Sequence, residues 1–168
     1  MRGIVNSITT KRNLETYEDV KIVLYKLVEC VSERLRKHGF VCSTVQITIR
    51  DSSLMSYERQ GSLLIPCCTT NEIFDKAFEL FKAHHYPFVP VRKLGVRACN
   101  LTNSNYVQMS FDKRFVDMQR HEKIDETIDN LRCRFGHYAV QRGISLVDTE
   151  LSHINTTEDH VIHPTAYR

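Results

Sequence analysis

The chain has 168 residues, of which 42% are hydrophobic and 26% are charged, and its formal net charge is +3. These values are typical of one globular domain with a small appendage. No apolar run approaches the ~20 residues of a membrane span, and the first residues lack the apolar core of a signal peptide, so we expect no membrane partner. A net charge this small does not indicate a nucleic-acid partner by itself.

The six cysteines and eight histidines show no spacing typical of a metal site. No two cysteines have the CxxC spacing, and we interpret the cysteines as small apolar packing residues in a reducing compartment, the cytoplasm. His153, His160 and His163 lie in a polar segment rather than on a rigid element. We therefore predict no metal and no cofactor in this chain.

The first two predicted elements are a strand and a long helix. Ile4–Arg12 is rich in β-forming residues and predicts a strand. Thr16–His38 predicts a helix, because Thr16 and Asp19 have the spacing of a capping box and Gly39 is placed as a left-handed stop. Apolar residues recur at helical spacing between these ends, at Val20, Val23, Leu24, Leu27, Val28, Val31 and Leu35.

A hairpin is predicted next. Phe40–Asp51 alternates between apolar and polar residues, and Tyr57–Pro66 forms its second strand. Val45, Ile47 and Ile49 then face one side of the sheet, and Thr44, Gln46, Thr48 and Arg50 face the other.

A second helix and a last strand follow the hairpin. The helix opens at a second capping-box pattern, Thr69 to Glu72, and ends before Pro87. The strand runs from Val89 to about Leu101. Its residues Leu94, Val96 and Ala98 point to the core, whereas Lys93, Gly95 and Arg97 point outward with Arg92 at the entrance.

The order β-α-β-β-α-β predicts an α+β, ferredoxin-like fold, in which two helices cover one face of a four-stranded sheet. We assign residues 1–103 to this domain, 104–114 to a linker, 115–150 to a helical extension and 151–168 to a polar tail without fixed structure. The extension contains a third helix from about Val116 to Phe135. Its predicted buried face consists of Ile124, Ile128, Leu131 and Phe135.

The uncovered face of the sheet is the candidate site. Hydroxyls, an amide, cations and a glycine suit phosphate oxygens and impose no base preference. An RNA-recognition module would need aromatic side chains on the central strands, and the outward positions there hold Gln46, Thr48, Lys93 and Arg97. A regulatory module that binds a small ligand, a protein-interaction module and an ordinary solvated face stay open as alternatives.

No catalytic constellation stands out in the sequence. No strand carries the paired carboxylates that hold two metal ions over a nucleotide, and the common phosphate-binding and hydrolase motifs are missing. Cys67 and Cys68 have no evident activating histidine. The acidic residues mostly lie on helix faces predicted to be solvated, namely Glu15, Glu18, Glu29, Glu33, Asp125, Glu126 and Asp129.

Three blocks of the sequence resemble the little finger domain of Y-family translesion DNA polymerases, with the UmuC-like bacterial branch as the nearest match. The blocks are NSITTKRNLETYEDVKIVLYKLVECVSERLRKHGFVCSTVQITIRD, LLIPCCTTNEIF and VRKLGVRACNL, within residues 3–112. The segment KIDETIDNLRCRFGHYAVQRGISL also resembles the C-terminal extension of that branch, to about residue 148.

The resemblance implies a domain that grips the backbone of the primer–template duplex in a bacterial cytoplasm. By motif, the implied contacts are Arg92, Lys93, Gly95 and Arg97, and further candidates are Lys11, Arg12, Thr44 and Thr48. Nucleotidyl transfer with two Mg²⁺ ions belongs to a palm domain in this family. Since the palm motifs have no match here, we expect this chain alone not to be an enzyme and to act beside the palm and fingers of a parent polymerase.

The segment QMSFD, residues 108–112, resembles the short peptide by which the family binds a sliding clamp. The resemblance gives Gln108 the role of a hydrogen-bonded amide and gives Met109 and Phe111 the roles of apolar anchors. Asp112 stands where the peptide usually has a final aromatic residue. An ordinary linker is the alternative interpretation.

Overall fold

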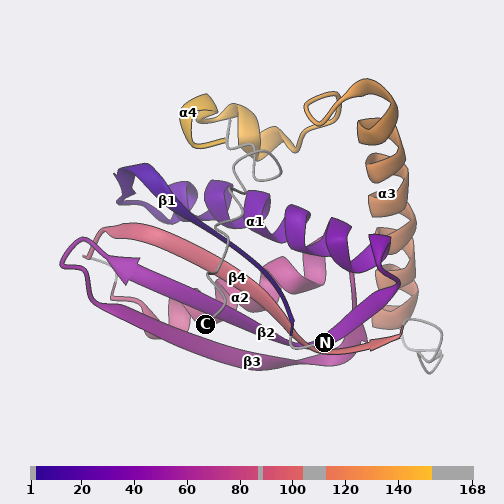
Figure 1. Ribbon diagram of the computed structural model, residues 1–168, viewed down its shortest axis with the longest axis horizontal. Helices are drawn as coiled ribbons and strands as arrows, with labels where there is room; N and C mark the ends of the chain where they lie inside the picture. The colour runs from indigo at the N-terminus through magenta and orange to yellow at the C-terminus, as the bar shows by residue number, and fades with distance from the viewer. Residues whose placement is uncertain (1–2, 87–88, 104–112, 153–168) are drawn as a thin grey trace, which may run out of the picture.

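The computed structural model describes residues 3–86, 89–103 and 113–152. They form one sheet with two covering helices and a helical extension (Figure 1). The domain elements are β1 (Ile4–Leu14), α1 (Tyr17–Lys37), β2 (Phe40–Asp51), β3 (Ser56–Cys67), α2 (Thr70–His84) and β4 (Val91–Asn103). The predicted order and the α+β class are confirmed, and the ends of these elements lie within about two residues of their predicted positions.

The sheet has the order β1-β4-β2-β3, and each neighbouring pair is antiparallel. Both βαβ units are therefore split: β4 lies between β1 and β2, and β2 lies between β3 and β4. The inner strands are β4 and β2, which are the strands that carry most of the candidate site.

The ends of α1 are set by local chemistry. The Thr16 hydroxyl accepts a hydrogen bond from the Asp19 backbone N–H at 3.1 Å, and the Asp19 carboxylate accepts one from the Thr16 backbone N–H at 3.3 Å. Gly39 has a φ of 66°, which confirms the left-handed stop. At α2 the second predicted capping box does not form in the same way: the Thr69 hydroxyl donates to the Glu72 carboxylate instead of accepting from the backbone.

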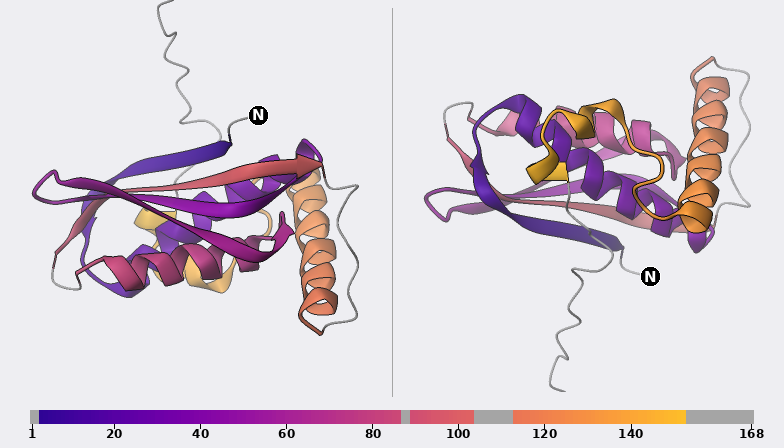
Figure 2. Two further views of the ribbon diagram at one scale, coloured as in Figure 1. Left: turned by 90° about the horizontal axis from the view of Figure 1, so that it is seen from below. Right: turned by 90° about the horizontal axis from the view of Figure 1, so that it is seen from above.

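Both helices lie against one face of the sheet, and the other face is uncovered by described elements (Figure 2). The core between the layers is apolar. It contains the fully buried Leu24 and Leu27 of α1, Ile47 of β2, Ile73 of α2 and Val96 of β4. The inward positions predicted on β2 and β4 are thus confirmed.

The extension begins with α3 (Lys113–Phe135) and continues through a 3₁₀ turn, η2 (Gly143–Leu146), to α4 (Thr149–Ser152). After α3 the chain runs back across α1, so that the extension lies on the helical side of the domain (Figure 2, right). Among the described residues, no helix is long and apolar enough to cross a membrane.

The predicted buried face of α3 is wrong. Ile124 is 48% exposed and Phe135 is 65% exposed, whereas the buried residues of α3 are Phe115, Met118 and Asp125. The helix instead docks through Phe115 and Met118, which belong to the hydrophobic core, and through the polar contacts of Asp125.

The candidate clamp peptide lies outside the described residues, as do residues 153–168 of the predicted tail. The first two residues assigned to the tail, Leu151 and Ser152, are buried in α4, so the helical extension reaches Ser152 rather than residue 150.

Candidate nucleic-acid interface

On the uncovered face of the sheet, called the open face below, the strand register places side chains in rows, three of which extend across all four strands. Successive residues on one face of a strand are two positions apart, about 6.6–6.8 Å. The first row is Val5, Arg97, Gln46 and Gln60; the second is Ser7, Gly95, Thr48 and Glu58; the third is Thr9, Lys93, Arg50 and Ser56. The outward residues predicted on β2 and β4 are therefore direct neighbours.

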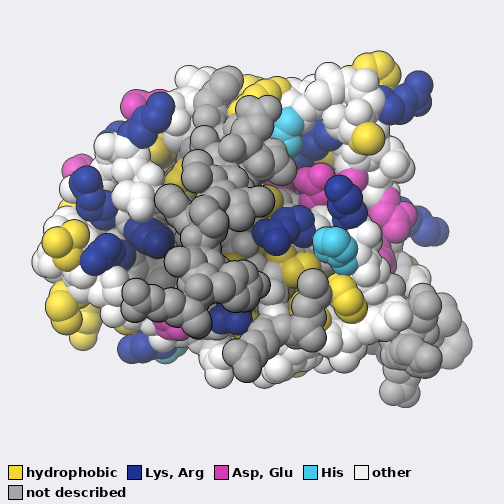
Figure 3. Space-filling model, in the orientation of Figure 1, with side chains coloured by type: hydrophobic (Ala, Val, Ile, Leu, Met, Phe, Trp, Pro, Cys, Tyr) yellow, Lys and Arg dark blue, Asp and Glu magenta, His cyan; other side chains and the backbone are white. Residues whose placement is uncertain are grey.

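Cations occupy the first and third rows. Arg97 lies in the first row, and Lys93 lies beside Arg50 in the third, on the two inner strands. Lysine and arginine side chains predominate at the left of Figure 3, over the end of the sheet where β2 turns into β3. The two cationic rows are about 13 Å apart, so the open face presents separated donors rather than one dense cluster.

Gly95 lies in the middle row, and the sheet itself gives a reason for this glycine. A Cβ atom at this position would lie 3.0 Å from the Ser7 Cβ and 3.4 Å from the Thr48 Cβ. The first distance is too short for an unstrained contact. The glycine thus relieves crowding between three neighbouring strands, in addition to the close approach of a ligand backbone that the sequence suggests.

Glu58 is the residue of the open face that the sequence analysis missed. Its carboxylate accepts hydrogen bonds from the Gln46 amide, at 2.5 Å, and from the Thr48 hydroxyl, at 3.2 Å. These two donors are therefore occupied within the sheet, and a negative charge lies at the edge of the middle row. The alternation of Ser56, Glu58 and Gln60 along β3 was the signal that would have placed Glu58 here.

Thr44 and Arg12, two of the further candidates, have structural partners. Thr44 is buried, and its hydroxyl accepts from the Asn100 side-chain amide at 2.9 Å. Arg12 donates to Asp19 at 2.8 Å and to Asp148 at 2.7 Å. The Arg12 guanidinium holds the pKa of both carboxyl groups below their ordinary values. Their contacts favour a structural role for these two residues.

Lys11 and Arg92 are exposed at the same end of the sheet. The β2–β4 register shifts at this point, because Arg50 pairs with Lys93 whereas Asp51 pairs with Val91. Arg92 is the extra residue of this irregularity. Such bulges turn a side chain away from the regular alternation, and this explains why Arg92 is exposed at a position where alternation alone predicts a core residue.

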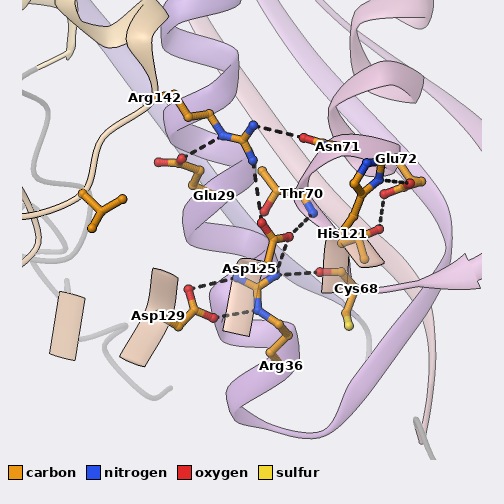
Figure 4. Close-up of polar contacts among 12 residues, drawn as sticks. Glu29, Arg36, Cys68, Thr70, Asn71, Glu72, His121, Asp125, Asp129 and Arg142 are labelled. Carbon is orange, nitrogen blue, oxygen red and sulfur yellow. Dashed lines mark hydrogen bonds and ion pairs between the residues drawn. The ribbon is translucent and has the colours of Figure 1, made fainter. Parts of the chain in front are cut away.

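On the opposite side of the molecule, a second group of charged residues holds the extension in place. We call it the polar clamp; it consists of Glu29, Arg36, Asp125, Asp129, Arg132 and Arg142. Figure 4 labels these residues except Arg132. Arg36 of α1 contacts Asp129 at 2.6 Å and Asp125 at 3.2 Å. Glu29 and Asp125 are buried, so the prediction that both lie on solvated helix faces is wrong.

Asp125 connects several elements within the polar clamp. Its carboxylate accepts from the Thr70 backbone N–H at 2.7 Å and lies 3.7 Å from the Arg142 guanidinium. Arg142 also donates to Glu29 at 3.1 Å. Burial by itself lowers the pKa of the Arg36 guanidinium, but its hydrogen bond to Asp129 and the two aspartate charges outweigh burial and raise it. In the polar clamp, the positive charges of the arginines are thus paired with the negative charges of the carboxylates.

Cys42, Cys67 and Cys68 are buried thiols, and they bear on the prediction that the cysteines are packing residues. Burial raises the pKa of the Cys67 thiol to about 11, and it raises those of Cys42 and Cys68 further. A protonated, buried thiol is unreactive, so these cysteines act as packing residues. In the part of the chain that the structure describes, no three His, Cys, Asp or Glu side chains converge into a metal site.

Similarity to known proteins supports this architecture. The family model described as impB/mucB/samB family C-terminal domain matches residues 1–111. The DNA polymerase IV of Acetivibrio thermocellus is 43% identical over 155 residues, which cover 92% of this chain and 39% of that protein. The DNA polymerase IV of Pelotomaculum thermopropionicum is 28% identical over 146 residues, which cover 87% and 36%.

Among solved structures, the chain is similar to one described as a complex of the beta-clamp processivity factor and the little finger domain of PolIV. The TM-score is 0.51, the identity is 11%, and the match covers 65% of this chain and 97% of that chain. A similarity at this identity concerns the fold alone.

The fold thus defines a class: a small α+β domain of the little finger type, with a polar open face. The chain belongs to the impB/mucB/samB C-terminal domain family, and Y-family DNA polymerases are among its homologues. It spans 39% and 36% of the length of the two relatives described above.

Proposed function

We propose that this chain binds duplex DNA through its open face, without sequence preference, as the little finger domain of an error-prone polymerase that acts in DNA-damage tolerance. The observation that carries the proposal is the pair of cationic rows on the inner strands, at Lys93 with Arg50 and at Arg97. Cations and hydroxyls neutralise and bind phosphates whatever the base sequence.

Three properties of the open face favour this function over the alternatives. In the three rows, the inner strands hold no aromatic side chain on which an RNA base would stack. In the middle row, Gly95 has no side chain that projects from the open face, and this suits close approach by a polynucleotide backbone. The cations of the polar clamp are matched to buried carboxylates, whereas the three rows contain one carboxylate, that of Glu58.

We place nucleotidyl transfer in the part of the parent polymerase that corresponds to the rest of the relatives' length. The Mg²⁺ ions of this reaction would belong to the palm domain of the parent polymerase, which is a further proposed partner of this chain.

A sliding clamp is the second proposed partner, through Gln108, Met109 and Phe111. The similar solved structure is described as a complex with a clamp, which supports this proposal. Gln108→Ala should abolish capture of this chain by the bacterial sliding clamp, and undiminished capture would refute the peptide assignment.

A salt titration tests DNA binding by the chain. We expect weak affinity for a primer–template duplex, with a Kd of roughly 10⁻⁴–10⁻⁶ M near physiological salt that rises steeply with salt concentration. The logarithm of the binding constant should fall linearly with the logarithm of salt concentration, because bound cations release counterions from DNA. No binding at low salt would refute the proposal.

Paired variants then locate the contact. Lys93→Ala with Arg97→Ala should weaken binding equally for unrelated sequences and flatten the salt slope by about two. The matched control is Lys21→Ala with Lys82→Ala, which removes two cations that lie over the Phe78 ring on the helical layer. This control should leave the slope unchanged. Equal effects of the two pairs would move the binding surface away from the open face.

A further inference from the structure

The turn between β2 and β3 presents two apolar side chains to solvent. Leu54 is 60% exposed and Met55 is 68% exposed. Single exposed apolar residues are common on protein surfaces, but these two are adjacent and lie at the end of a hairpin. Hydrophobic side chains are visible beside the lysine and arginine side chains at the left of Figure 3. The backbone at this turn shows why the pair is unusual.

Leu54 has a φ of 69°, in the left-handed region. This conformation is disfavoured for a residue with a bulky side chain, and glycine or asparagine adopts it more readily. Packing of the Leu54 side chain does not offset the cost of this backbone conformation, since most of its surface is exposed. Residues in such strained backbone conformations cluster at functional sites, including ligand-binding positions.

The turn is also held in one shape by its own hydrogen bonds. The Asp51 carboxylate accepts from the Met55 backbone N–H at 3.0 Å and from the Ser53 hydroxyl at 2.7 Å. The Ser52 backbone N–H donates to the Pro90 carbonyl at 2.9 Å, which ties the turn to the start of β4. These bonds pre-form the presentation of Leu54 and Met55, so a ligand does not have to order the turn.

The surroundings of the turn indicate the chemistry of the ligand. Arg50 immediately precedes the turn, and its Nε donates to the Leu54 carbonyl at 3.3 Å. Lys93 is the register partner of Arg50 on β4, and Arg92 is exposed next to it. Asp51, the nearby acid, is occupied in holding the turn. An apolar pair bordered by cations favours an anionic polymer that also has apolar faces.

We propose that Leu54 and Met55 form an apolar contact with the deoxyribose faces of duplex DNA, beside the phosphates held by the third row of the open face. Sugars lie next to the phosphates along each strand, and proteins that grip DNA contact both. Leucine and methionine are also residues that proteins place against the walls and base steps of a groove. This inference rests on the proposed DNA binding and adds a contact to it that does not depend on charge.

The test is the double variant Leu54→Asn with Met55→Ser in the full chain, measured against a fluorescent primer–template duplex across a salt series. We expect affinity to fall about tenfold at every salt concentration, while the salt slope stays that of the unaltered chain, because no cation is removed. Thermal stability should stay equal or rise, since asparagine suits the left-handed backbone. The single variant Leu54→Met should retain most of the affinity.

The matched control is Leu146→Asn with Val147→Ser. These residues are 68% and 69% exposed on the extension, away from the open face. The control should bind DNA as the unaltered chain does. If it weakens binding equally, general loss of surface hydrophobicity explains the effect and the inference is overturned.

The remaining outcomes separate this inference from the function on which it rests. Unaltered binding by the turn variant, with a normal salt slope for the unaltered chain, overturns the inference alone and points to a protein that contacts the turn. A flattened slope in the turn variant also overturns it, since the effect would then act through the neighbouring cations. Absence of binding by the unaltered chain refutes the proposed function and this inference together.

Discussion

The open face and the polar clamp use the same residue types for opposite purposes. In the polar clamp, the Arg36 side chain is only 9% exposed and contacts two aspartates, so its charge is neutralised within the protein. On the open face, Lys93 and Arg50 are neighbours in the third row, and the only carboxylate of the three rows is that of Glu58. The difference teaches that the position of the carboxylates, more than the number of cations, decides whether a group of cations is neutralised within the protein.

Breaking the polar clamp should have the largest effect on stability. Arg36→Met leaves the buried Asp125 and the partly exposed Asp129 without this cation, and removal of one partner from a buried ion pair costs about 3–5 kcal/mol. Urea unfolding measures this change in the free energy of unfolding. Lys37→Met, at the exposed neighbouring position, is the control and should change it by less than about 0.5 kcal/mol. If Arg36→Met changes the free energy of unfolding as little as Lys37→Met does, the polar clamp does not hold the extension.

The glycine row comes next in magnitude. Gly95→Val should lower the free energy of unfolding by about 1–3 kcal/mol, because the new side chain overpacks against Ser7 and Thr48. Chemical denaturation and DNA binding are measured on the same variant. If the stability of Gly95→Val is unchanged while its DNA affinity falls, glycine is needed at this position only for close approach of the DNA, and crowding within the sheet does not require it.

The contacts of Arg12 predict a smaller, pH-dependent effect. Asp19 and Asp148 have lowered pKa values in the folded state, with the hydrogen bond from Arg12 as the main cause. Their stabilisation is therefore complete above the unfolded pKa of about 3.9, and it is lost as pH falls through the lower folded values.

Arg12→Gln tests this prediction through thermal unfolding across a pH series. The variant should be less stable than the unaltered chain by about 0.5–1 kcal/mol above pH ~4, where Arg12, being partly exposed, is screened by solvent. The difference should shrink in more acidic solution. A difference that stays constant with pH would mean that packing of the arginine stem, rather than its ion pairs, stabilises the protein.

Glu58→Gln should have the smallest effect, and its sign is the informative part. The substitution removes one negative charge from the open face and keeps a hydrogen-bonding oxygen near Gln46 and Thr48. DNA affinity should rise about twofold at low salt, as expected for one screened charge at about 10 Å. Reduced affinity would instead show that the carboxylate is needed to position those two donors.

The sequence predicted the sheet domain well because its signals are local. Alternation along Phe40–Asp51 and helical spacing after Thr16 each depend on which side of an element meets the core, and that core is apolar. The outward positions of the inner strands followed from the same alternation. Register between strands then placed Lys93 beside Arg50, and this step requires the tertiary structure.

The extension was predicted less well for a physical reason. Hydrophobic periodicity assumes that a helix buries one apolar stripe along its length. In α3 only the first part buries apolar residues, Phe115 and Met118, and the rest docks through the ion pairs of Asp125, Asp129 and Arg132. Buried ion pairs of this kind join residues far apart in sequence and leave no periodic pattern. The same limit applies to the ion pair between Arg12 and Asp148, because these residues lie near opposite ends of the chain and leave no sequence pattern.

The split arrangement of the sheet has a consequence for how the protein is made. Among the described residues β4 is the last strand in chain order, yet it pairs with both β1 and β2. Until Val91–Asn103 has been synthesised, no strand connects β1 to the β2–β3 hairpin by hydrogen bonds. The edges of β1 and β2 that later pair with β4 therefore lack partners. Sheet closure is therefore a late step that joins distant segments. Since β4 carries Lys93 and Arg97, the cationic rows are assembled only when the domain is completely folded.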